Sequence, residues 1–407
     1  MIRAAVTGLG VRTPAGNELK GFWETLVSGR SCARTLTSPD FGGLPVDFAC
    51  PVADPSASSH VTAKQERRMD RATLLAVCAA ADALADAGQY EALPERRAVV
   101  TGTGLAGNET SEITLLDHDE RGHGRPTALY VPKVMHNAAA AFISMRHRIL
   151  GPSLTISTAC ASGGHAIGEG LRLLRDGSAD MVVAGGAEAC VSPTILLAFH
   201  RCGALSQRRA EPERASRPFD VDRDGFVLAE GAAFVVLERL EDAVRRGARV
   251  YAELAGYGRT SDAHHLTMPD PDGDGAERCM RQALSNARSS ASDVVHVNAH
   301  GSGTPLNDAT EAKVIARLFG PGQVPVTSTK SVLGHAIGAA GAIEAVVSVL
   351  TLHERLIPPT INLDSQDPSC EIDVPRRPRP LTAGAVVSNS FAFGGHNASL
   401  VFTPAPS

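Results

Sequence analysis

The order of apolar and polar positions is repeated along this chain. Apolar runs that end in glycines occupy 4–11 and 250–258, and each is followed by an amphipathic helical pattern, at 68–88 and at 276–288. Short apolar runs rich in Val and Ala are typical of strands that are buried on both faces of a parallel sheet. Strands that alternate with helices imply right-handed crossover connections. The pattern therefore predicts an α/β protein with buried sheets.

Later segments extend the correspondence between the two halves. Strand patterns begin near residues 97, 153 and 180 in the first half and near 293, 324 and 385 in the second. The patterns near 153 and 324 each end in a Ser-Thr pair, and each is followed by a small-residue helix with the letters GHAIG. We therefore expect two similar α/β halves, residues 1–248 and 249–407, packed as one body.

Composition narrows the class of protein. The 407 residues are 43% hydrophobic and 20% charged, and the net charge of −5 argues against a nucleic-acid binder. The eight cysteines show no CxxC spacing, which disfavours a zinc site or a disulfide framework. The N-terminus lacks a signal pattern, and no apolar run reaches the roughly 18 residues of a membrane helix. We expect a cytoplasmic protein that contacts no membrane.

Cys160 lies between the strand pattern at 153 and the first small-residue helix. The backbone N–H groups and the dipole at a helix N-terminus favour a thiolate. The small neighbours of Cys160 permit a tight turn such as a nucleophile needs. On this local context a nucleophile and a buried structural cysteine, which we assume for the other seven, are about equally supported.

Three segments of the second half carry further polar chemistry. His300 opens a glycine-rich loop in which the hydroxyls of Ser302 and Thr304 could contact an extended ligand arm. Lys330 has small or apolar neighbours, which indicates burial, and Glu311 is the candidate partner for its charge. A surface lysine and a structural histidine are the alternatives. The glycine-flanked turn at Phe393 can supply an oxyanion-hole N–H, or it can be a plain hairpin.

Taken in order, several motifs resemble those of the β-ketoacyl-ACP synthases, the condensing enzymes of the thiolase superfamily. The similarity runs over almost the whole chain, through "VTGLGVRTPAG", "TACASGG", "SRPFDVDRDGFVLAEGAA", "AHGSGTPLNDATE", "TKSVLGHAIGAAG", "IPPTINL" and "NSFAFGGHN". It implies a thiolase fold, with duplicated βαβαβαββ halves in a five-layered αβαβα arrangement. That fold agrees with the duplication read from the apolar pattern.

The resemblance also implies roles for single residues. Cys160 matches the acyl-accepting nucleophile, and His300 and His335 complete a Cys-His-His set. Phe393 matches the residue whose N–H joins that of Cys160 in the oxyanion hole and whose ring gates the site. Further positions match polar residues of the family: Lys330 and Glu311 as a pair beside the histidines, and Ser302 and Thr304 along the phosphopantetheine arm.

The implied reaction is a decarboxylative Claisen condensation of malonyl-ACP with the acyl chain on Cys160, without a metal or a bound cofactor. A degradative thiolase has a second cysteine near the C-terminus, and a starter synthase has Asn where this chain has His335. A chain-length factor lacks the nucleophile, so a non-catalytic partner of that type is disfavoured. We expect the ketosynthase of a type II polyketide synthase, with a fatty acid elongating synthase as the alternative.

The resemblance further implies an acyl carrier protein as partner, and either a homodimer or a heterodimer with a chain-length-factor-like homologue. The carrier is acidic in this family, and the candidate docking residues are basic: Lys64, Arg67, Arg68, Arg121 and Arg125. Solvated surface arginines are an equally supported interpretation. His165, in the first GHAIG copy, lies more than one helical turn beyond Cys160, so we expect it to be buried and structural.

Overall fold

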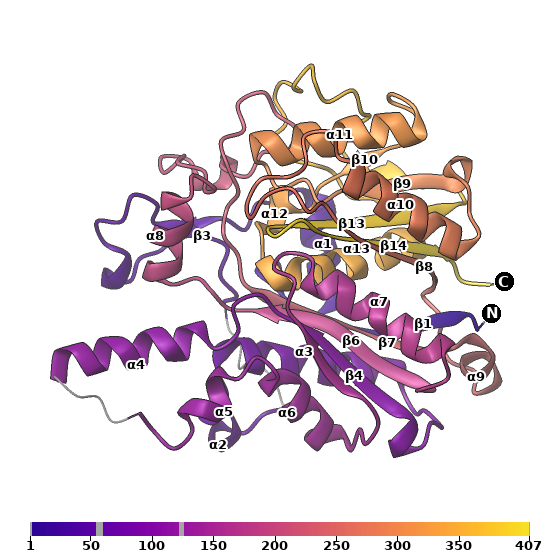
Figure 1. Ribbon diagram of the computed structural model, residues 1–407, viewed down its shortest axis with the longest axis horizontal. Helices are drawn as coiled ribbons and strands as arrows, with labels where there is room; N and C mark the ends of the chain where they lie inside the picture. The colour runs from indigo at the N-terminus through magenta and orange to yellow at the C-terminus, as the bar shows by residue number, and fades with distance from the viewer. Residues whose placement is uncertain (1, 54–59, 122–125, 407) are drawn as a thin grey trace.

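Ten strands form the main sheet of the protein, and a computed structural model describes them within residues 2–53, 60–121 and 126–406 (Figure 1). The strands of the first half are β1 (Ala4–Arg12), β4 (Arg97–Gly102), β5 (Ser153–Ile156), β6 (Met181–Glu188) and β7 (Gly231–Arg239). Those of the second half are β8 (Ala252–Ser261), β9 (Val294–Asn298), β10 (Val326–Thr327), β13 (Ala385–Ala392) and β14 (His396–Pro404). Two small antiparallel two-stranded sheets lie outside this sheet: β2 (Arg34–Thr35) with β3 (Phe48–Ala49), and β11 (Leu356–Ile357) with β12 (Arg379–Pro380).

The two halves share one strand order. The sheet reads β5-β4-β6-β7-β1 from one edge to its middle and β10-β9-β13-β14-β8 from the other edge. Numbered within its own half, each set therefore has the order 3-2-4-5-1. In each half four strands run parallel to one another, and the fifth, β7 in the first half and β14 in the second, runs antiparallel to them. The sets meet where Ala4–Val6 of β1 pairs with Ala252–Leu254 of β8.

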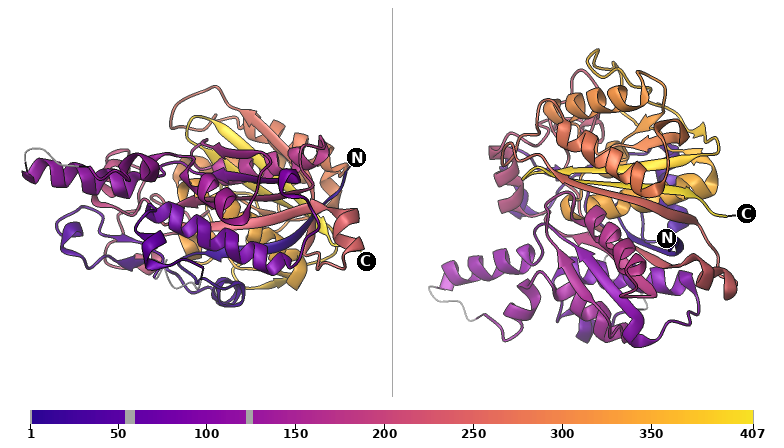
Figure 2. Two further views of the ribbon diagram at one scale, coloured as in Figure 1. Left: turned by 90° about the horizontal axis from the view of Figure 1, so that it is seen from below. Right: turned by 45° about the vertical axis from the view of Figure 1, so that its right-hand side comes forward.

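Helices cover both outer faces and fill the space between the two sets of strands. α3 (Arg71–Ala87) and α6 (Ala138–His147) pack on the outside of the first set, and α10 (Asp274–Ala287) and α11 (Pro305–Phe319) on the outside of the second. α7 (Ser162–Arg175) and α13 (Ala340–Glu354) contact each other between the sets (Figures 1 and 2). This is the expected five-layered αβαβα thiolase fold. Further helices lie in the connections: α1 (Leu19–Ser28), α2 (Ala63–Glu66), α4 (Asn108–Arg121), α5 (Tyr130–Val134), α8 (Pro193–Arg201), α9 (Leu240–Arg245) and α12 (Lys330–Leu333).

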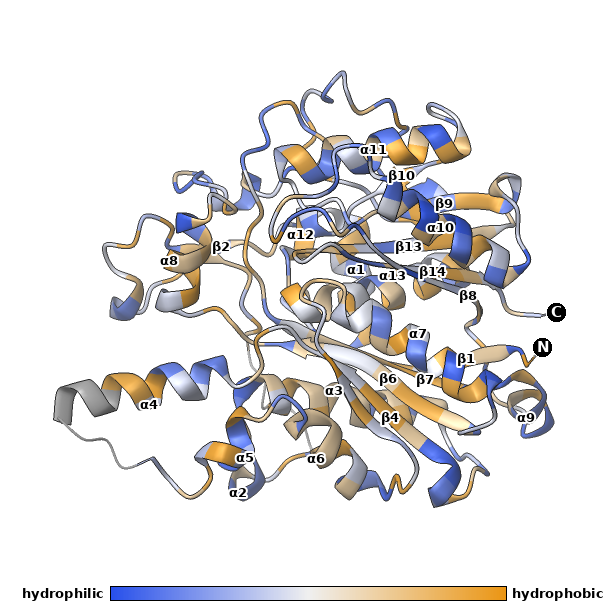
Figure 3. Cartoon of the chain, in the orientation of Figure 1, coloured by the Kyte–Doolittle hydropathy of each residue, from blue (hydrophilic) through white to orange (hydrophobic). Residues whose placement is uncertain are grey.

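Of the two helices between the sets of strands, α13 is the more apolar. The stretch Ile337–Glu354 has the length and hydropathy of a membrane-spanning helix, but 89% of it is buried inside the protein. α13 contacts β6 and β7 of the first set and β13 and β14 of the second, and Figure 3 shows the hydropathy of these layers. A core helix between two sheets needs apolar residues around its whole circumference, so burial in the protein accounts for the composition.

The two GHAIG copies adopt different structures, which corrects the expectation of a helix for each. The first copy lies inside α7, whereas the second follows α12 as an extended segment and enters a 3₁₀ turn at Ile337–Ala339. The physical reason is that the His335 backbone pairs with a neighbouring chain: its N–H donates to Val227 O (2.7 Å) and its carbonyl accepts from Ala229 N (3.0 Å). Those bonds replace the helical ones.

Candidate active site

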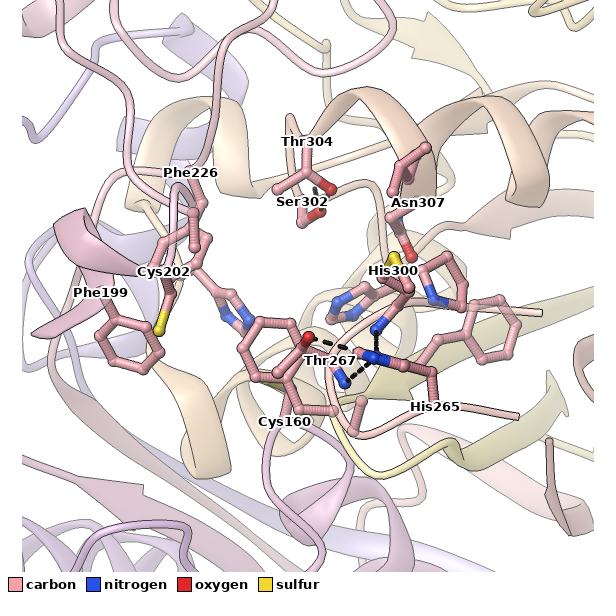
Figure 4. Close-up of a pocket in the computed structure, with 18 of the residues that line it drawn as sticks. Cys160, Phe199, Cys202, Phe226, His265, Thr267, His300, Ser302, Thr304 and Asn307 are labelled. Atoms are coloured by element: carbon pink, nitrogen blue, oxygen red, sulfur yellow. Dashed lines mark hydrogen bonds between the residues drawn. The ribbon is translucent and has the colours of Figure 1, made fainter. Parts of the chain in front are cut away.

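Residues from both halves surround a cavity of about 510 Å³. Six of the expected site residues line it: Cys160, His300, His335, Phe393, Ser302 and Thr304. Figure 4 shows Cys160 at one end, His300 beside it, and Ser302 and Thr304 farther along the same space. Lys330 and Glu311 do not line the cavity and instead contact His300 from behind.

Cys160 lies on a sharp turn between β5 and α7. The preceding residue, Ala159, has a φ of +48°, a left-handed conformation that a non-glycine residue adopts only at a cost. The turn is held by Ser162 Oγ, which accepts from Thr158 N (2.8 Å) and contacts Ala159 O (2.7 Å). The strained turn brings the thiol to the cavity although Cys160 is only 8% exposed.

The thiol of Cys160 is not a free thiolate. Burial raises its pKa to about 12, while the charge of Lys330 and the backbone N–H groups of Phe393 and Cys160 lower it. The sequence predicts that the helix N-terminus favours the thiolate; in the structure these favourable groups are present but burial outweighs them. Deprotonation of Cys160 must therefore accompany its reaction.

Phe393 lies in the turn that joins β13 to β14. Its N–H reaches the sulfur of Cys160 alongside the N–H of Cys160 itself. The turn is fastened to a second loop, because Gly394 N donates to Leu266 O (2.7 Å) and Asp262 N donates to Gly395 O (2.9 Å). Two backbone donors thus converge at one point of the cavity, which is the arrangement that stabilises a developing oxyanion.

The rings of His300 and His335 lie next to each other on the cavity wall in an edge-to-face arrangement, with ring centroids 5.3 Å apart and planes at 80°. Both rings are buried, and burial together with the nearby charge of Lys330 holds their pKa values well below 6.5. Both histidines are therefore neutral near pH 7. A neutral imidazole carries one N–H donor, so the pair can supply two donors to a single acceptor.

Lys330 sets the orientation of His300. Its Nζ donates to His300 O (2.6 Å), lies 3.4 Å from His300 Nδ1, and forms an ion pair with Glu344. An ammonium group has no acceptor, so the Nδ1 that faces it is the unprotonated nitrogen and the ring proton is on Nε2. The predicted partner of Lys330, Glu311, is wrong: the counter-charge is Glu344, from α13.

Glu311 holds the backbone of His300 instead. Its carboxylate accepts from His300 N (2.9 Å), Gly301 N (2.8 Å) and Asn389 Nδ2 (3.3 Å). Burial raises the pKa of Glu311 to about 7, against the lowering effect of these N–H donors. Gly301 has a φ of +40°, and a Cβ there would come within 2.6 Å of Ser328 Cβ, so this loop requires glycine.

Ser302 and Thr304 lie together on the wall of the cavity, with 2.9 Å between their hydroxyl oxygens (Figure 4). Each hydroxyl can both donate and accept, so the pair can exchange its mutual hydrogen bond for bonds to a polar chain. The cavity therefore joins a nucleophile, two neutral imidazoles, two backbone donors and a polar side wall.

Comparison with known proteins agrees with this geometry. The model of the β-ketoacyl synthase N-terminal domain matches residues 2–243, and that of the C-terminal domain matches residues 251–364. The chain belongs to the β-ketoacyl synthase family. It is accordingly an acyltransferase of the condensing type.

Relatives match the enzyme over nearly its full length. The 3-oxoacyl-[acyl-carrier-protein] synthase 2 of Rhizobium meliloti is 42% identical, and that of Synechocystis sp. is 41% identical, each over 98% of this chain and at least 97% of the relative. Among solved structures, a β-ketoacyl synthase from Burkholderia phymatum has a TM-score of 0.92 at 34% identity. The ishigamide ketosynthase/chain length factor has 0.91 at 35%, and both cover 100% of both chains.

Sequence reasoning missed Glu344, although a signal for it exists. Between 336 and 352 it is the sole charged residue in a run of small and apolar residues. A lone carboxylate in a core helix needs a buried cation, and Lys330 is that cation. Burial raises the pKa of Glu344 to about 7, and Lys330 opposes the shift.

Other expected positions fall outside the cavity. His165 is buried in α7, does not line the cavity, and pairs its Nδ1 with Tyr257 OH (2.7 Å), as expected for a structural residue. Lys64, Arg67 and Arg68 are exposed on α2 and the turn after it. Arg125 lies outside the described residues, and of Arg121 only the backbone, at the end of α4, is described.

Proposed function

We propose that this enzyme condenses a malonyl thioester with an acyl chain held on Cys160, by decarboxylative Claisen condensation, and that it elongates fatty acids on acyl carrier protein. The observation that carries the proposal is the convergence of Cys160, His300, His335 and the N–H of Phe393 on one cavity. The reaction divides into two half-reactions, and each uses a different part of this set.

In the first half-reaction Cys160 accepts the acyl chain. Because the thiol is protonated in the free enzyme, its proton leaves as sulfur attacks the thioester carbonyl, and it ends on the departing pantetheine sulfur. The N–H groups of Cys160 and Phe393 stabilise the tetrahedral oxyanion. The hydroxyls of Ser302 and Thr304 contact the pantetheine arm that delivers the chain.

In the second half-reaction the malonyl thioester loses CO₂. Nε2–H of His300, whose tautomer Lys330 sets, donates to the thioester carbonyl, and His335 is the second donor. The enolate carbon then attacks the acyl carbonyl, and the sulfur of Cys160 leaves and is reprotonated. Loss of CO₂ generates the carbanion and the two imidazoles stabilise its oxygen, so the proposed reaction uses no metal and no bound cofactor.

The relatives support the choice of fatty acid synthesis as the pathway. Sequence motifs favour a polyketide ketosynthase, but the relatives at 39–42% identity are named 3-oxoacyl-[acyl-carrier-protein] synthase 2, which favours the fatty acid reading. Polyketide synthesis is the second candidate. Its support is structural: the ishigamide ketosynthase/chain length factor, and a type II polyketide ketosynthase solved with its acyl-carrier protein at a TM-score of 0.91 and 31% identity.

Two surfaces support the proposed partners. The exposed basic residues Lys64, Arg67 and Arg68 suit an acidic carrier protein. The edge strand β5 has no neighbour on its outer side within the described residues, and Leu154 on it is 45% exposed. Exposed apolar side chains continue onto α4, α5 and α6: Ile113, Leu115, Leu116, Val131 and Met145. We propose that a second copy of the chain covers this face.

The half-reactions provide the test of the activity. Cys160→Ala should abolish acyl transfer from acyl-ACP, followed as the adduct mass of the protein. His335→Ala should slow malonyl-ACP decarboxylation by about 10²–10³-fold, the usual effect of losing one such donor. His165→Ala is the matched control, since its imidazole lies outside the cavity and should leave decarboxylation intact. Acylation of the Cys160→Ala protein would refute the nucleophile assignment.

The pathway needs a separate experiment. The purified chain alone is given malonyl-ACP and saturated acyl-ACPs of increasing length, and the products are identified by mass spectrometry. Elongation by the chain alone supports fatty acid synthesis. A protein that is inactive until a chain-length-factor-like homologue is added supports the polyketide candidate instead.

A further inference from the structure

A buried carboxylate that the proposed chemistry does not use lies between the two halves. Glu188, the last residue of β6, is fully buried, and its oxygens accept from Gly104 N (2.7 Å), Leu105 N (3.1 Å), Gly338 N (3.0 Å) and Thr103 Oγ1 (3.2 Å). Within the described residues no lysine, arginine or histidine forms an ion pair with it. Three backbone N–H groups and one hydroxyl therefore balance this charge.

One set of these donors belongs to the loop that supports the nucleophile. Thr103 O accepts from Ser162 Oγ (3.1 Å), the hydroxyl that also holds the turn before Cys160. Gly104 lies against the same turn, because a Cβ there would be 3.7 Å from Ala159 Cα. The position of the 103–105 loop therefore sets the position of the strained turn that presents Cys160.

The remaining donor belongs to the loop that carries His335. Gly338 N is three residues after His335, and the residue between them on the cavity wall, Ile337, has a φ of +42°. A left-handed conformation in a β-branched residue is strained and persists only where its surroundings enforce it. Gly338 and Gly104 also touch, since a Cβ on Gly338 would come within 2.3 Å of Gly104 N.

We propose that Glu188 is a positioning residue whose ionised carboxylate fastens the Cys160 turn of the first half to the His335 loop of the second. An ionised carboxylate is an acceptor at both oxygens and suits four converging donors. A protonated carboxyl directs an O–H at a donor instead, which opens the connection. The kinetic part of this inference rests on the proposed condensing activity; the structural part does not.

The connection should respond to pH near neutrality. Burial raises the pKa of Glu188 to about 7, although the N–H donors lower it. Among the described residues, the titratable groups that interact with it are Cys160 and Cys190; Lys330 and Glu230 are one step farther away and interact with Cys160 and Cys190 respectively. Above this pKa Glu188 is ionised and its carboxylate joins the two loops. As the pH falls through this pKa, Glu188 takes up a proton and the connection is lost. Glu311 and Glu344 share this range, so a variant of Glu188 is needed to separate them.

Hydrogen exchange tests the connection without reference to activity. In Glu188→Gln at pH 8, the amides of Gly104, Leu105 and Gly338 should each lose at least about tenfold in protection, or about 1.4 kcal/mol. Glu238→Gln is the control, because Glu238 is also a buried carboxylate but accepts from Thr7 and Arg246. It lies at the opposite end of β7 from Gly231, the residue that pairs with Glu188. Unchanged protection at Gly104 and Gly338 in Glu188→Gln would overturn the proposal.

The pH dependence of the two half-reaction rates distinguishes a positioning residue from one that only stabilises the fold. At pH 8 both acylation of Cys160 and decarboxylation should fall together in Glu188→Gln, by about tenfold. The difference from wild type should shrink toward pH 6, because wild-type Glu188 then carries a proton too. If the ratio of the wild-type rate to the Glu188→Gln rate stays constant between pH 6 and pH 8, the proposal is contradicted.

The wild-type protein supplies a second test if Glu188→Gln does not fold. Exchange at Gly104 and Gly338, corrected for the intrinsic pH dependence of amide exchange, should accelerate from pH 8 to pH 6, and its absence would refute the inference. If wild type never forms an acyl adduct while exchange responds as expected, the proposed function fails and the connection stands. If wild type turns over and Glu188→Gln matches it at each pH, the connection is wrong.

Discussion

Lys330 shows how one buried charge controls the chemistry of its neighbours. Its ammonium contacts His300 at two atoms, pairs with Glu344, and lowers the pKa values of Cys160, His300 and His335. It cannot serve as an acceptor, so it also selects the tautomer of His300. Lys330 therefore influences the protonation of Cys160, His300 and His335 and sets which nitrogen of His300 carries the proton.

We predict that Lys330→Met slows decarboxylation by about tenfold or more, because His300 is no longer held with its proton on Nε2. The pKa of His300 should also rise toward 6.5, since the repelling charge is gone. Imidazole ¹⁵N NMR between pH 5 and 8 measures this shift: wild-type His300 should stay neutral throughout, whereas His300 of the variant should begin to protonate at the lower end.

Lys313→Met is the matched control, because Lys313 is an exposed lysine that pairs with Asp272 away from the cavity. It should change neither the decarboxylation rate nor the titration of His300. A Lys330→Met protein whose His300 keeps its wild-type titration would show that burial alone sets the histidine pKa.

At the scale of elements, the hairpin of β13 and β14 places a backbone donor. Its turn contains Gly394 (φ +84°) and Gly395 (φ +71°), and a Cβ at Gly395 would lie 3.0 Å from Asp262 Cβ. Glycine adopts this conformation without the steric cost that a side chain brings. The geometry of the turn therefore fixes where the N–H of Phe393 points.

Gly395→Ala should lower the stability by about 1–2 kcal/mol, the cost of a left-handed alanine, and should also slow acylation of Cys160. The control is Gly177→Ala, where φ is +78° and the added Cβ meets nothing within 4 Å. It should show a similar loss of stability in denaturant unfolding but a normal acylation rate. If Gly395→Ala and Gly177→Ala acylate Cys160 at equal rates, the turn between β13 and β14 does not contribute to acylation.

The elements themselves were largely predictable. Strands such as β1 and β6 and helices such as α3 and α7 have strong periodic patterns and lie where the apolar pattern places them. The second GHAIG copy was not predictable, because its letters are those of a helix and only hydrogen bonds to Val227 and Ala229 keep His335 extended. Those partners are more than a hundred residues away in the chain.

At the scale of the whole molecule, the apolar face around β5 is the surface to which the proposed dimer is assigned. In Figure 1, α4 projects from the body on the side away from α9. α4 contacts α5, α5 contacts α6, and α6 contacts β5, and each of the four carries exposed apolar side chains, among them Leu115, Leu116 and Leu154. An edge strand with exposed apolar side chains is a template for pairing with another chain. In the proposed dimer, the β5 of the second copy would pair with this edge and satisfy its unpaired backbone groups.

Leu154→Arg should therefore convert a dimer to monomers in sedimentation velocity at micromolar concentration. Val244→Arg is the control, because Val244 is 61% exposed on α9, which packs against β1 and β7 rather than against β5, and it should leave the dimer intact. If the wild-type protein sediments as a monomer and dimerises only with a chain-length-factor-like homologue, that homologue, and not a second copy of the chain, is the partner at this face.

The sequence by itself predicted the duplicated α/β architecture from its apolar period. It singled out Cys160, His300, His335 and Phe393 through the resemblance of their motifs to those of the condensing enzymes, because the local pattern around each residue left a structural role open. Only the tertiary structure decided the partner of Lys330, the protonated state of the Cys160 thiol and the carboxylate of Glu188 between the halves. The physical reason is that burial and charge depend on elements brought together from distant parts of the chain.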